Sequence, residues 1–186
     1  MKPNPHALVS ALLLACLVLP AQAFEQGWVS WVIDGDTVVL VPQGQRESVK
    51  LRIAGIDAPE ACQSGGESAR LALIALVQRR TVRVQTTGQD SYGRPLGRLW
   101  VDQMDVGAEL VRQGQAWAYE HRTGRGPYAA LQRQARSERK GLFAAQDRPM
   151  SPAVFRQFNG SCHPDVDAAA QAPLGRLPQT GQSGSR

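Results

Sequence analysis

Three segments of this chain alternate apolar and polar residues with a period of two, which is the pattern of half-buried β-strands. They cover residues 28–40, 47–56 and 81–85. Two shorter strand candidates, residues 97–101 and 116–119, each follow a glycine-containing turn. This pattern limits the chain to a fold with about five short strands.

Three helices are predicted around these strands. The first begins near Ser64, because Ser64 and Glu67 have capping-box spacing before the apolar run ARLALIALVQ. The second follows Asp105 as its N-cap and stops at Gly114. The third covers residues 127–140, with proline at its first position. The elements together predict a mainly β domain of the α+β class, a five-stranded, partly open OB-fold barrel with about three packed helices.

Residues 1–23 have the organisation of a secretory signal peptide. Lys2 precedes an apolar run, and the segment ends in Ala-Gln-Ala, the small-x-small pattern of a cleavage site. Cys16 leaves lipid attachment open, although the apolar run continues beyond it. No later segment has the roughly 18 apolar residues of a membrane span. We therefore expect an exported protein, periplasmic or secreted, whose mature chain is a soluble monomer.

Signal cleavage would leave two cysteines, Cys62 and Cys162. In an oxidising compartment such a pair favours a disulfide, with two separate buried thiols as the alternative. The bond would close a loop of about 100 residues and stabilise the fold by at most roughly 4 to 5 kcal/mol. We expect residues 151–164 to form a strap that this disulfide holds against the loop after Glu60.

The composition fits one domain with a basic balance. Hydrophobic residues make up 42% of the 186 residues, enough for a core, and residues 24–150 are predicted to form the domain. The formal net charge is +5, which suits a polyanionic partner without identifying one. Residues 165–186 lack aromatic residues and are expected to be a flexible tail.

The stretch VIDGDTVVL, residues 32–40, predicts a hairpin, because Asp-Gly between two β-branched runs is a strong turn signal. A turn needs one aspartate. If Asp34 serves the turn, Asp36 remains as an additional carboxylate at the start of the next strand.

The stretch LRIAGIDAPE, residues 51–60, carries Arg52, Asp57 and Glu60. Strict alternation would place Arg52 and Asp57 on opposite faces of one strand, so they share a site only if the strand bends. Gly55 is suited to such a bend, and Pro59 ends the strand. An exposed turn with an ordinary surface ion pair is the alternative. A later stretch, DSYGRPLGRLW, reads first as a turn but places Arg94 at the mouth of the next strand.

Four motifs therefore occur in the order VIDGDTVVL, LRIAGIDAPE, DSYGRPLGRLWVD and AELVRQGQAWAY. In order and spacing they resemble the staphylococcal nuclease (thermonuclease) family, over roughly residues 27–142. The resemblance implies an OB-fold and a calcium-dependent phosphodiesterase that cuts DNA and RNA without strict sequence preference. It also implies roles for six residues: metal binding by Asp36, Asp57 and the Ala58 carbonyl, general-base catalysis by Glu60, and phosphate binding by Arg52 and Arg94.

The chain departs from the family pattern at Ala58, where the best-known member has threonine. The backbone carbonyl is kept, so the metal should still bind, but a hydroxyl that could order water is lost. Oxygen-only ligands favour calcium or magnesium over zinc or copper, and so few charged ligands imply a Kd on the order of 0.1 to 1 mM for calcium. Tyr119 is a candidate for stacking on a base of the substrate, whereas core packing is expected for Trp117.

The main alternative is an OB-fold module that binds single-stranded nucleic acid without cutting it. Such a module has no need of carboxylates, yet three acids accompany the two arginines here. The sequence thus favours catalysis, with DNA and RNA as substrates and no stable protein partner.

Overall fold

The structure is a computed structural model that describes residues 26–119, 126–144, 149–160 and 162. The predicted signal peptide and C-terminal tail lie outside the described residues, so both stay predictions. Among the described residues, no helix combines the length and the apolar character that a membrane crossing requires.

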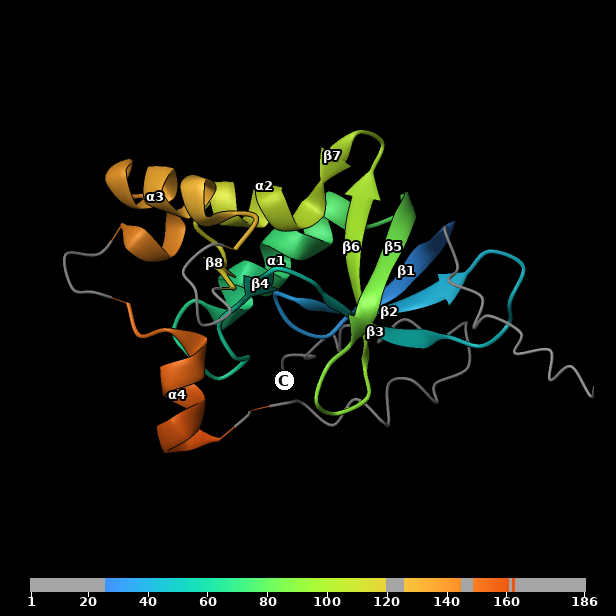
Figure 1. The fold of residues 1–186 in the computed structure, drawn as a ribbon, viewed down its shortest axis with the longest axis horizontal. Helices are drawn as coiled ribbons and strands as arrows, with labels where there is room; N and C mark the ends of the chain where they lie inside the picture. The colour runs from blue at the N-terminus through green and yellow to red at the C-terminus, as the bar shows by residue number, and fades with distance from the viewer. Residues whose placement is uncertain (1–25, 120–125, 145–148, 161, 163–186) are drawn as a thin grey trace, which may run out of the picture.

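Five strands form a closed barrel: β1 (Gln26–Val32), β2 (Thr37–Pro42), β3 (Val49–Ile53), β5 (Thr81–Gln89) and β6 (Pro95–Val101). The strands pair in the order β3-β2-β1-β5-β6, each antiparallel to its neighbour, and a parallel pairing of β3 with β6 closes the ring (Figure 1). The predicted five-stranded α+β fold is confirmed, with a closed barrel instead of a partly open one.

The hairpin predicted at the Asp-Gly turn is confirmed, so the alternating run of residues 28–40 forms two antiparallel strands. The predicted strand at residues 116–119 is the short β8 (Trp117–Ala118), which pairs with β4 (Ile56–Asp57) in a separate ladder outside the barrel. A further short strand, β7 (Met104–Asp105), pairs antiparallel with the end of β6.

The helices are α1 (Gly66–Val77), α2 (Val106–Arg112), α3 (Ala129–Ser137) and α4 (Pro152–Asn159), with a 3-10 turn at Gly141–Phe143. In Figure 1, α1 and α2 lie against the barrel, α3 packs beside α2, and α4 stands apart at the edge of the domain. The sequence analysis assigned the α4 region only to a strap.

The caps of two helices correct the predictions. The N-cap of α1 is Gly65 in the left-handed conformation, and Glu67 pairs with Arg70 at 2.9 Å, so the predicted capping box is wrong. α3 begins at Ala129, so proline does not occupy its first position. α2 begins as predicted, because the Asp105 side chain accepts a hydrogen bond from the backbone N–H of Ala108 at 3.0 Å.

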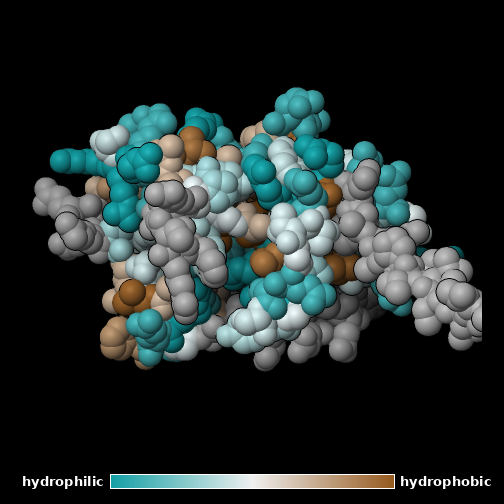
Figure 2. All heavy atoms as spheres, in the orientation of Figure 1, coloured by the Kyte–Doolittle hydropathy of each residue, from teal (hydrophilic) through white to brown (hydrophobic). Residues whose placement is uncertain are grey.

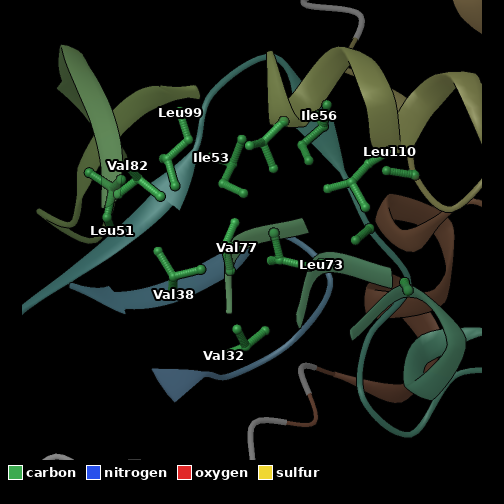
Figure 3. Packing of buried hydrophobic residues seen from close by; sticks show 14 of the residues in the cluster. Val32, Val38, Leu51, Ile53, Ile56, Leu73, Val77, Val82, Leu99 and Leu110 are labelled. Carbon is green, nitrogen blue, oxygen red and sulfur yellow. The ribbon is translucent and has the colours of Figure 1, made fainter. Parts of the chain in front are cut away.

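The core fills the barrel and its contact with the helices. Figure 3 shows Leu51, Ile53, Val82 and Leu99 from the strands turned toward Leu73 and Val77 of α1 and Leu110 of α2. A second small cluster joins Trp117 edge-on to Phe143, with ring centroids 5.7 Å apart, which confirms core packing for Trp117. Because these clusters hold β3, β4 and β8 in place, they fix the positions from which the candidate site residues project.

The face drawn in Figure 2 is mainly hydrophilic, with apolar side chains gathered over α4. The exposed apolar residues of this segment are Met150, Val154 and Phe158. Few apolar contacts therefore hold α4, and its position depends on the specific links described below.

Candidate functional site

The turn between β1 and β2 buries two aspartates, Asp34 and Asp36. The backbone N–H of Asp36 donates to Asp34 Oδ1 at 3.0 Å, so Asp34 serves the turn as predicted. A Cβ added at Gly35 would lie 2.7 Å from the Cβ of Ala58 and 2.6 Å from that of Ala69, too close for any other residue. This close approach places the Asp36 carboxylate beside β4.

A sharp bend between β3 and β4 brings Arg52 and Asp57 together. Gly55 has φ of 82°, in the left-handed region that favours glycine. Arg52 Nη2 then lies 2.8 Å from Asp57 Oδ1 and 2.9 Å from Asp36 Oδ2. The predicted bend is therefore present, and the alternative of an exposed surface ion pair is wrong, because both carboxylates are buried.

The segment after β4 supplies the third acid. The backbone N–H of Ala58 donates to Asp36 Oδ2 at 3.0 Å, which ties this segment to the β1–β2 turn. Glu60 lies two residues further on, and its backbone N–H donates to Gln63 Oε1 at 3.2 Å. Asp36, Asp57 and Glu60 are only 3%, 5% and 7% exposed.

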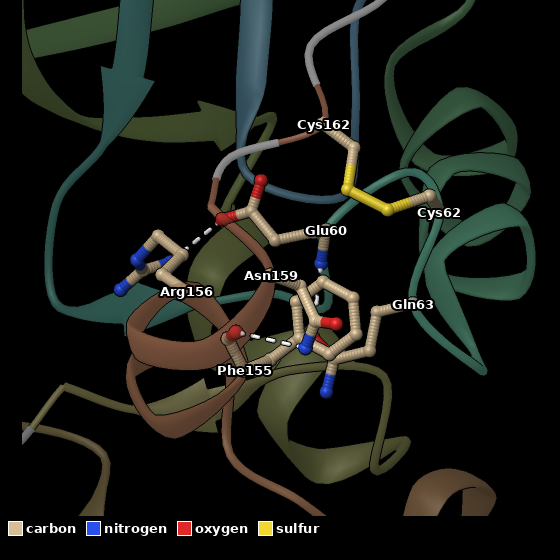
Figure 4. Close-up of a disulfide and its surroundings, with 7 residues drawn as sticks. All are labelled: Glu60, Cys62, Gln63, Phe155, Arg156, Asn159 and Cys162. Atoms are coloured by element: carbon tan, nitrogen blue, oxygen red, sulfur yellow. Dashed lines mark hydrogen bonds and ion pairs between the residues drawn. A yellow bond between two sulfur atoms is a disulfide. The ribbon is translucent and has the colours of Figure 1, made fainter.

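A second arginine, from α4, completes the cluster. Arg156 Nη1 donates to Glu60 Oε1 at 2.8 Å and to Asp57 Oδ1 at 3.1 Å, and Nη2 donates to Asp57 Oδ2 at 3.1 Å. In Figure 4, Arg156 extends from α4 toward the Glu60 carboxylate. The acids thus lie between two guanidinium groups that come from opposite ends of the domain sequence.

The electrostatics of the cluster are set by burial and by these arginines. Burial raises the pKa of Asp36 to about 6, with a further increase from Asp34 and an opposing effect of Arg52. Burial also raises the pKa of Asp57, against the hydrogen bonds from Arg156. For Arg52 and Arg156, burial lowers the pKa, but the neighbouring carboxylates outweigh it and both pKa values lie above the usual range. The arginines therefore stay charged, and the carboxylates are costly to keep ionised without another cation.

The structure places Arg94 near this cluster in the fold but not in contact with it. Arg94 precedes β6, the strand that pairs with β3 at Arg52. Its Nε donates to Asp90 Oδ2 at 2.6 Å, and its backbone N–H donates to Asp90 Oδ1 at 2.9 Å. Within the described part of the chain, no recorded contact joins Arg94 to the three acids.

Tyr119 follows β8 directly. In the β4–β8 ladder Trp117 pairs with Asp57, and the backbone N–H of Tyr119 donates to the Gly55 carbonyl at 2.9 Å. The Tyr119 side chain is 46% exposed. The residue therefore lies beside the bend that carries Asp57, and its contact with substrate stays a prediction.

The predicted disulfide between Cys62 and Cys162 is present, with the two Cα atoms 5.8 Å apart. It joins the loop after Glu60 to the residues after α4 (Figure 4). Gln63 makes a second link, because its Nε2 donates to the Met150 carbonyl at 2.7 Å. Both ends of α4 are thus connected to the loop that carries Glu60.

The residues present suit a hard divalent cation. Asp36 and Asp57 offer carboxylate oxygens, which calcium and magnesium prefer, and no sulfur or imidazole ligand of the zinc type accompanies them among the described residues. Over the same residues, no group of three or more His, Cys, Asp or Glu is arranged to hold a metal. A cation bound here would therefore be ligated by two carboxylates, with backbone carbonyl and water oxygens as its other ligands.

Sequence reasoning missed Arg156 and Gln63. Signals for α4 were available, because Ser151 precedes Pro152 and Gly160 follows Asn159, the usual start and stop of a helix. Nothing local, however, indicates that an arginine 96 residues beyond Glu60 would reach it.

Fold and site together define an OB-type barrel whose buried acids are paired with two arginines. The family model described as "Staphylococcal nuclease homologue" matches residues 50–145 of the chain. The chain belongs to the staphylococcal nuclease family.

Three relatives are similar over most of their length. An "Uncharacterized endonuclease" of Haemophilus influenzae is 34% identical over 83% of this chain and 86% of its own. "Protein ParB" of Escherichia coli is 41% identical over 77% of this chain and 88% of its own. A "Micrococcal nuclease" of Shigella flexneri is 34% identical over 73% of this chain and 83% of its own.

Proposed function

We propose that this protein is an exported, calcium-dependent nuclease that hydrolyses phosphodiester bonds of DNA and RNA with little sequence specificity. The observation that carries the proposal is a buried acidic cluster in which Arg52 joins Asp36 to Asp57 and Arg156 joins Asp57 to Glu60. Membership of the family supports nuclease activity, as do the relatives named endonuclease and micrococcal nuclease.

In this proposal each residue has a distinct task. Glu60 takes a proton from water, whose oxygen attacks phosphorus while the bond to the leaving sugar oxygen breaks and that oxygen takes up a proton from solvent. Arg156 bonds to Oε1 of Glu60, and we assign Oε2 to the water. Arg52 and Arg94 bind the phosphate oxygens, for which Arg94 exchanges its bond with Asp90 for one with phosphate. The planar guanidinium suits this task because it forms paired, charge-assisted hydrogen bonds.

A divalent cation fits the same cluster. We assign it to Asp36, Asp57 and the Ala58 carbonyl, where it would supply positive charge that stabilises the developing charge on phosphate. The raised pKa of Asp36 supports this assignment, because a cation would offset the cost of ionising a buried carboxylate.

Export to the periplasm or the medium is proposed on two grounds. The N-terminal segment has the pattern of a signal peptide, and a disulfide is typical of oxidising compartments. We further propose that the mature protein acts as a monomer.

The test is cleavage of single-stranded DNA and RNA by the purified protein, in calcium and in chelator, with Glu60→Gln as the control. Glutamine keeps an oxygen that can accept from Arg156 but cannot serve as a base. Calcium-dependent cleavage that the variant lacks would support the proposal. Equal binding by both proteins without cleavage would instead identify an OB-fold binding module.

A further inference from the structure

The helix α4 lies outside the barrel, yet it delivers a side chain to the acidic cluster. Arg156 in its last turn makes three hydrogen bonds to two acids, with nitrogen to oxygen distances of 2.8 to 3.1 Å. Its side chain is only 29% exposed. Such a contact requires that α4 be held accurately, although few apolar contacts secure it.

Two links hold α4 against the Glu60 loop. After the helix, Cys162 is bonded to Cys62, two residues beyond Glu60. Before the helix, Gln63 donates to the Met150 carbonyl at 2.7 Å and at the same time accepts from the backbone N–H of Glu60 at 3.2 Å. The loop that carries the proposed base is therefore linked to both ends of the helix that carries Arg156.

The hydrogen bonds of Arg156 fix one acid relative to the other. Nη1 bridges Glu60 Oε1 and Asp57 Oδ1, so the position of Glu60 depends on that of Asp57. Asp57 also pairs with Arg52, whose Nη2 lies 2.8 Å from it, but the same nitrogen is shared with Asp36. Arg156 uses three of its five N–H donors in these contacts.

We infer that Arg156 is a positioning residue for the proposed cleavage, one that holds Glu60 against Asp57 in the orientation needed to accept a proton from water. The inference rests on the proposed function. It has a second consequence, since the guanidinium occupies both oxygens of Asp57 and its charge opposes a divalent cation at the same carboxylate. Arg156 thus improves the orientation of Glu60 and weakens metal binding.

These two effects predict opposite changes in kcat and in calcium affinity when Arg156 is replaced, which a residue that only stabilises the fold would not produce. Replacing Arg156 by glutamine should lower kcat at saturating calcium by 10-fold or more, because Glu60 loses its orientation. The same change should tighten calcium binding by at least threefold, because a competing positive charge is removed. Lysine restores the charge but not the planar fork, so Arg156→Lys should return the calcium Kd toward the wild-type value without restoring kcat.

The experiment measures both quantities on the full-length protein. Isothermal titration with calcium alone gives the Kd in the absence of nucleic acid, and single-turnover cleavage of a DNA oligonucleotide at saturating calcium gives the rate. Wild type, Arg156→Gln and Arg156→Lys are compared with Arg133→Gln, which removes an exposed arginine from α3. The control variant should match the wild type in both measurements.

Tighter calcium binding together with slower cleavage in Arg156→Gln would support the inference. An unchanged or faster rate at saturating calcium would overturn it, because Arg156 would then be only a competitor of the metal. Weaker calcium binding together with slower cleavage would also overturn it and indicate a brace for the fold. If Arg156→Gln does not fold, Arg156→Lys provides the test. Normal cleavage by the lysine variant would show that the planar guanidinium is not needed, and it would overturn the inference.

A wild-type protein that does not cleave would remove the proposed function itself, and this is seen before any variant is compared.

The link through α4 has its own measurement. If the disulfide acts by holding Arg156, then Arg156→Gln should lower kcat much less in a protein that carries Cys62→Ser and Cys162→Ser than in the wild type. Fully additive losses would overturn that part of the inference.

Discussion

Replacing Asp36 by asparagine tests whether the acidic cluster is kept at the expense of stability. Burial raises the pKa of Asp36 from 3.8 to about 6. Asparagine keeps the shape of the side chain, and it can still accept from the Ala58 N–H and bond to the Thr37 hydroxyl, at the present 3.0 and 2.9 Å. We therefore expect Asp36→Asn to stabilise the metal-free protein at neutral pH.

The size of the gain follows from proton linkage. Because the folded pKa lies above the unfolded value, the folded state binds more protons between about pH 4 and 6, so stability falls as pH rises through this window. The difference between 3.8 and about 6 corresponds to roughly 3 kcal/mol, fully present above the folded pKa. The variant should therefore exceed the wild type by about 3 kcal/mol at pH 8 and by almost nothing below pH 4.

Urea unfolding in chelator at pH 4, 6 and 8 measures this difference. Asp102→Asn, which removes an exposed carboxylate, serves as the matched control and should show no comparable dependence on pH. A variant that is no more stable than the wild type at pH 8, or a difference that does not change with pH, would refute the reasoning. Either result would mean that the ion pair with Arg52 at least offsets the cost of burial.

Three further predictions concern the arginines and the disulfide. Arg52→Lys should lower kcat/KM by about 10²-fold, because an ammonium lacks the planar pair of donors proposed to bind phosphate, and near-normal steady-state kinetics would contradict this. Arg94→Ala should reduce single-turnover cleavage at least as much as Glu60→Gln, whereas an unimpaired rate would remove Arg94 from the phosphate site. Replacing Cys62 and Cys162 together by serine should lower the free energy of unfolding by up to about 4 kcal/mol in urea, and an unchanged value would indicate that the bond does not constrain the chain.

Local patterns were enough to predict part of the site. The turn at Asp34 and the bend at Gly55 are set by short-range backbone chemistry, so the sequence indicated Asp36 and allowed Arg52 to meet Asp57, while the resemblance to the family implied that they share a site. The start of α1 was misjudged because Gly65 takes the left-handed conformation and replaces the side-chain cap expected from Ser64.

Long-range contacts account for what the sequence did not predict. Arg156 meets Glu60 only because the disulfide and Gln63 bring α4 back to the barrel. The sequence showed the cysteine pair, but not which side chain the strap would present. The ion pair of Arg94 with Asp90 likewise depends on the conformation of a turn that the sequence indicated only in outline.

In the proposed function, Asp36 and Asp57 hold a calcium ion on which cleavage depends. The most direct test titrates calcium on one preparation while both the cleavage rate and the free energy of unfolding are followed. With a Kd on the order of 0.1 to 1 mM, 10 mM calcium should stabilise the fold by about 1.4 to 2.7 kcal/mol. Both signals should rise with the same midpoint and be absent in Asp36→Asn. Cleavage that persists in chelator, or a midpoint of stabilisation unrelated to that of cleavage, would contradict the account.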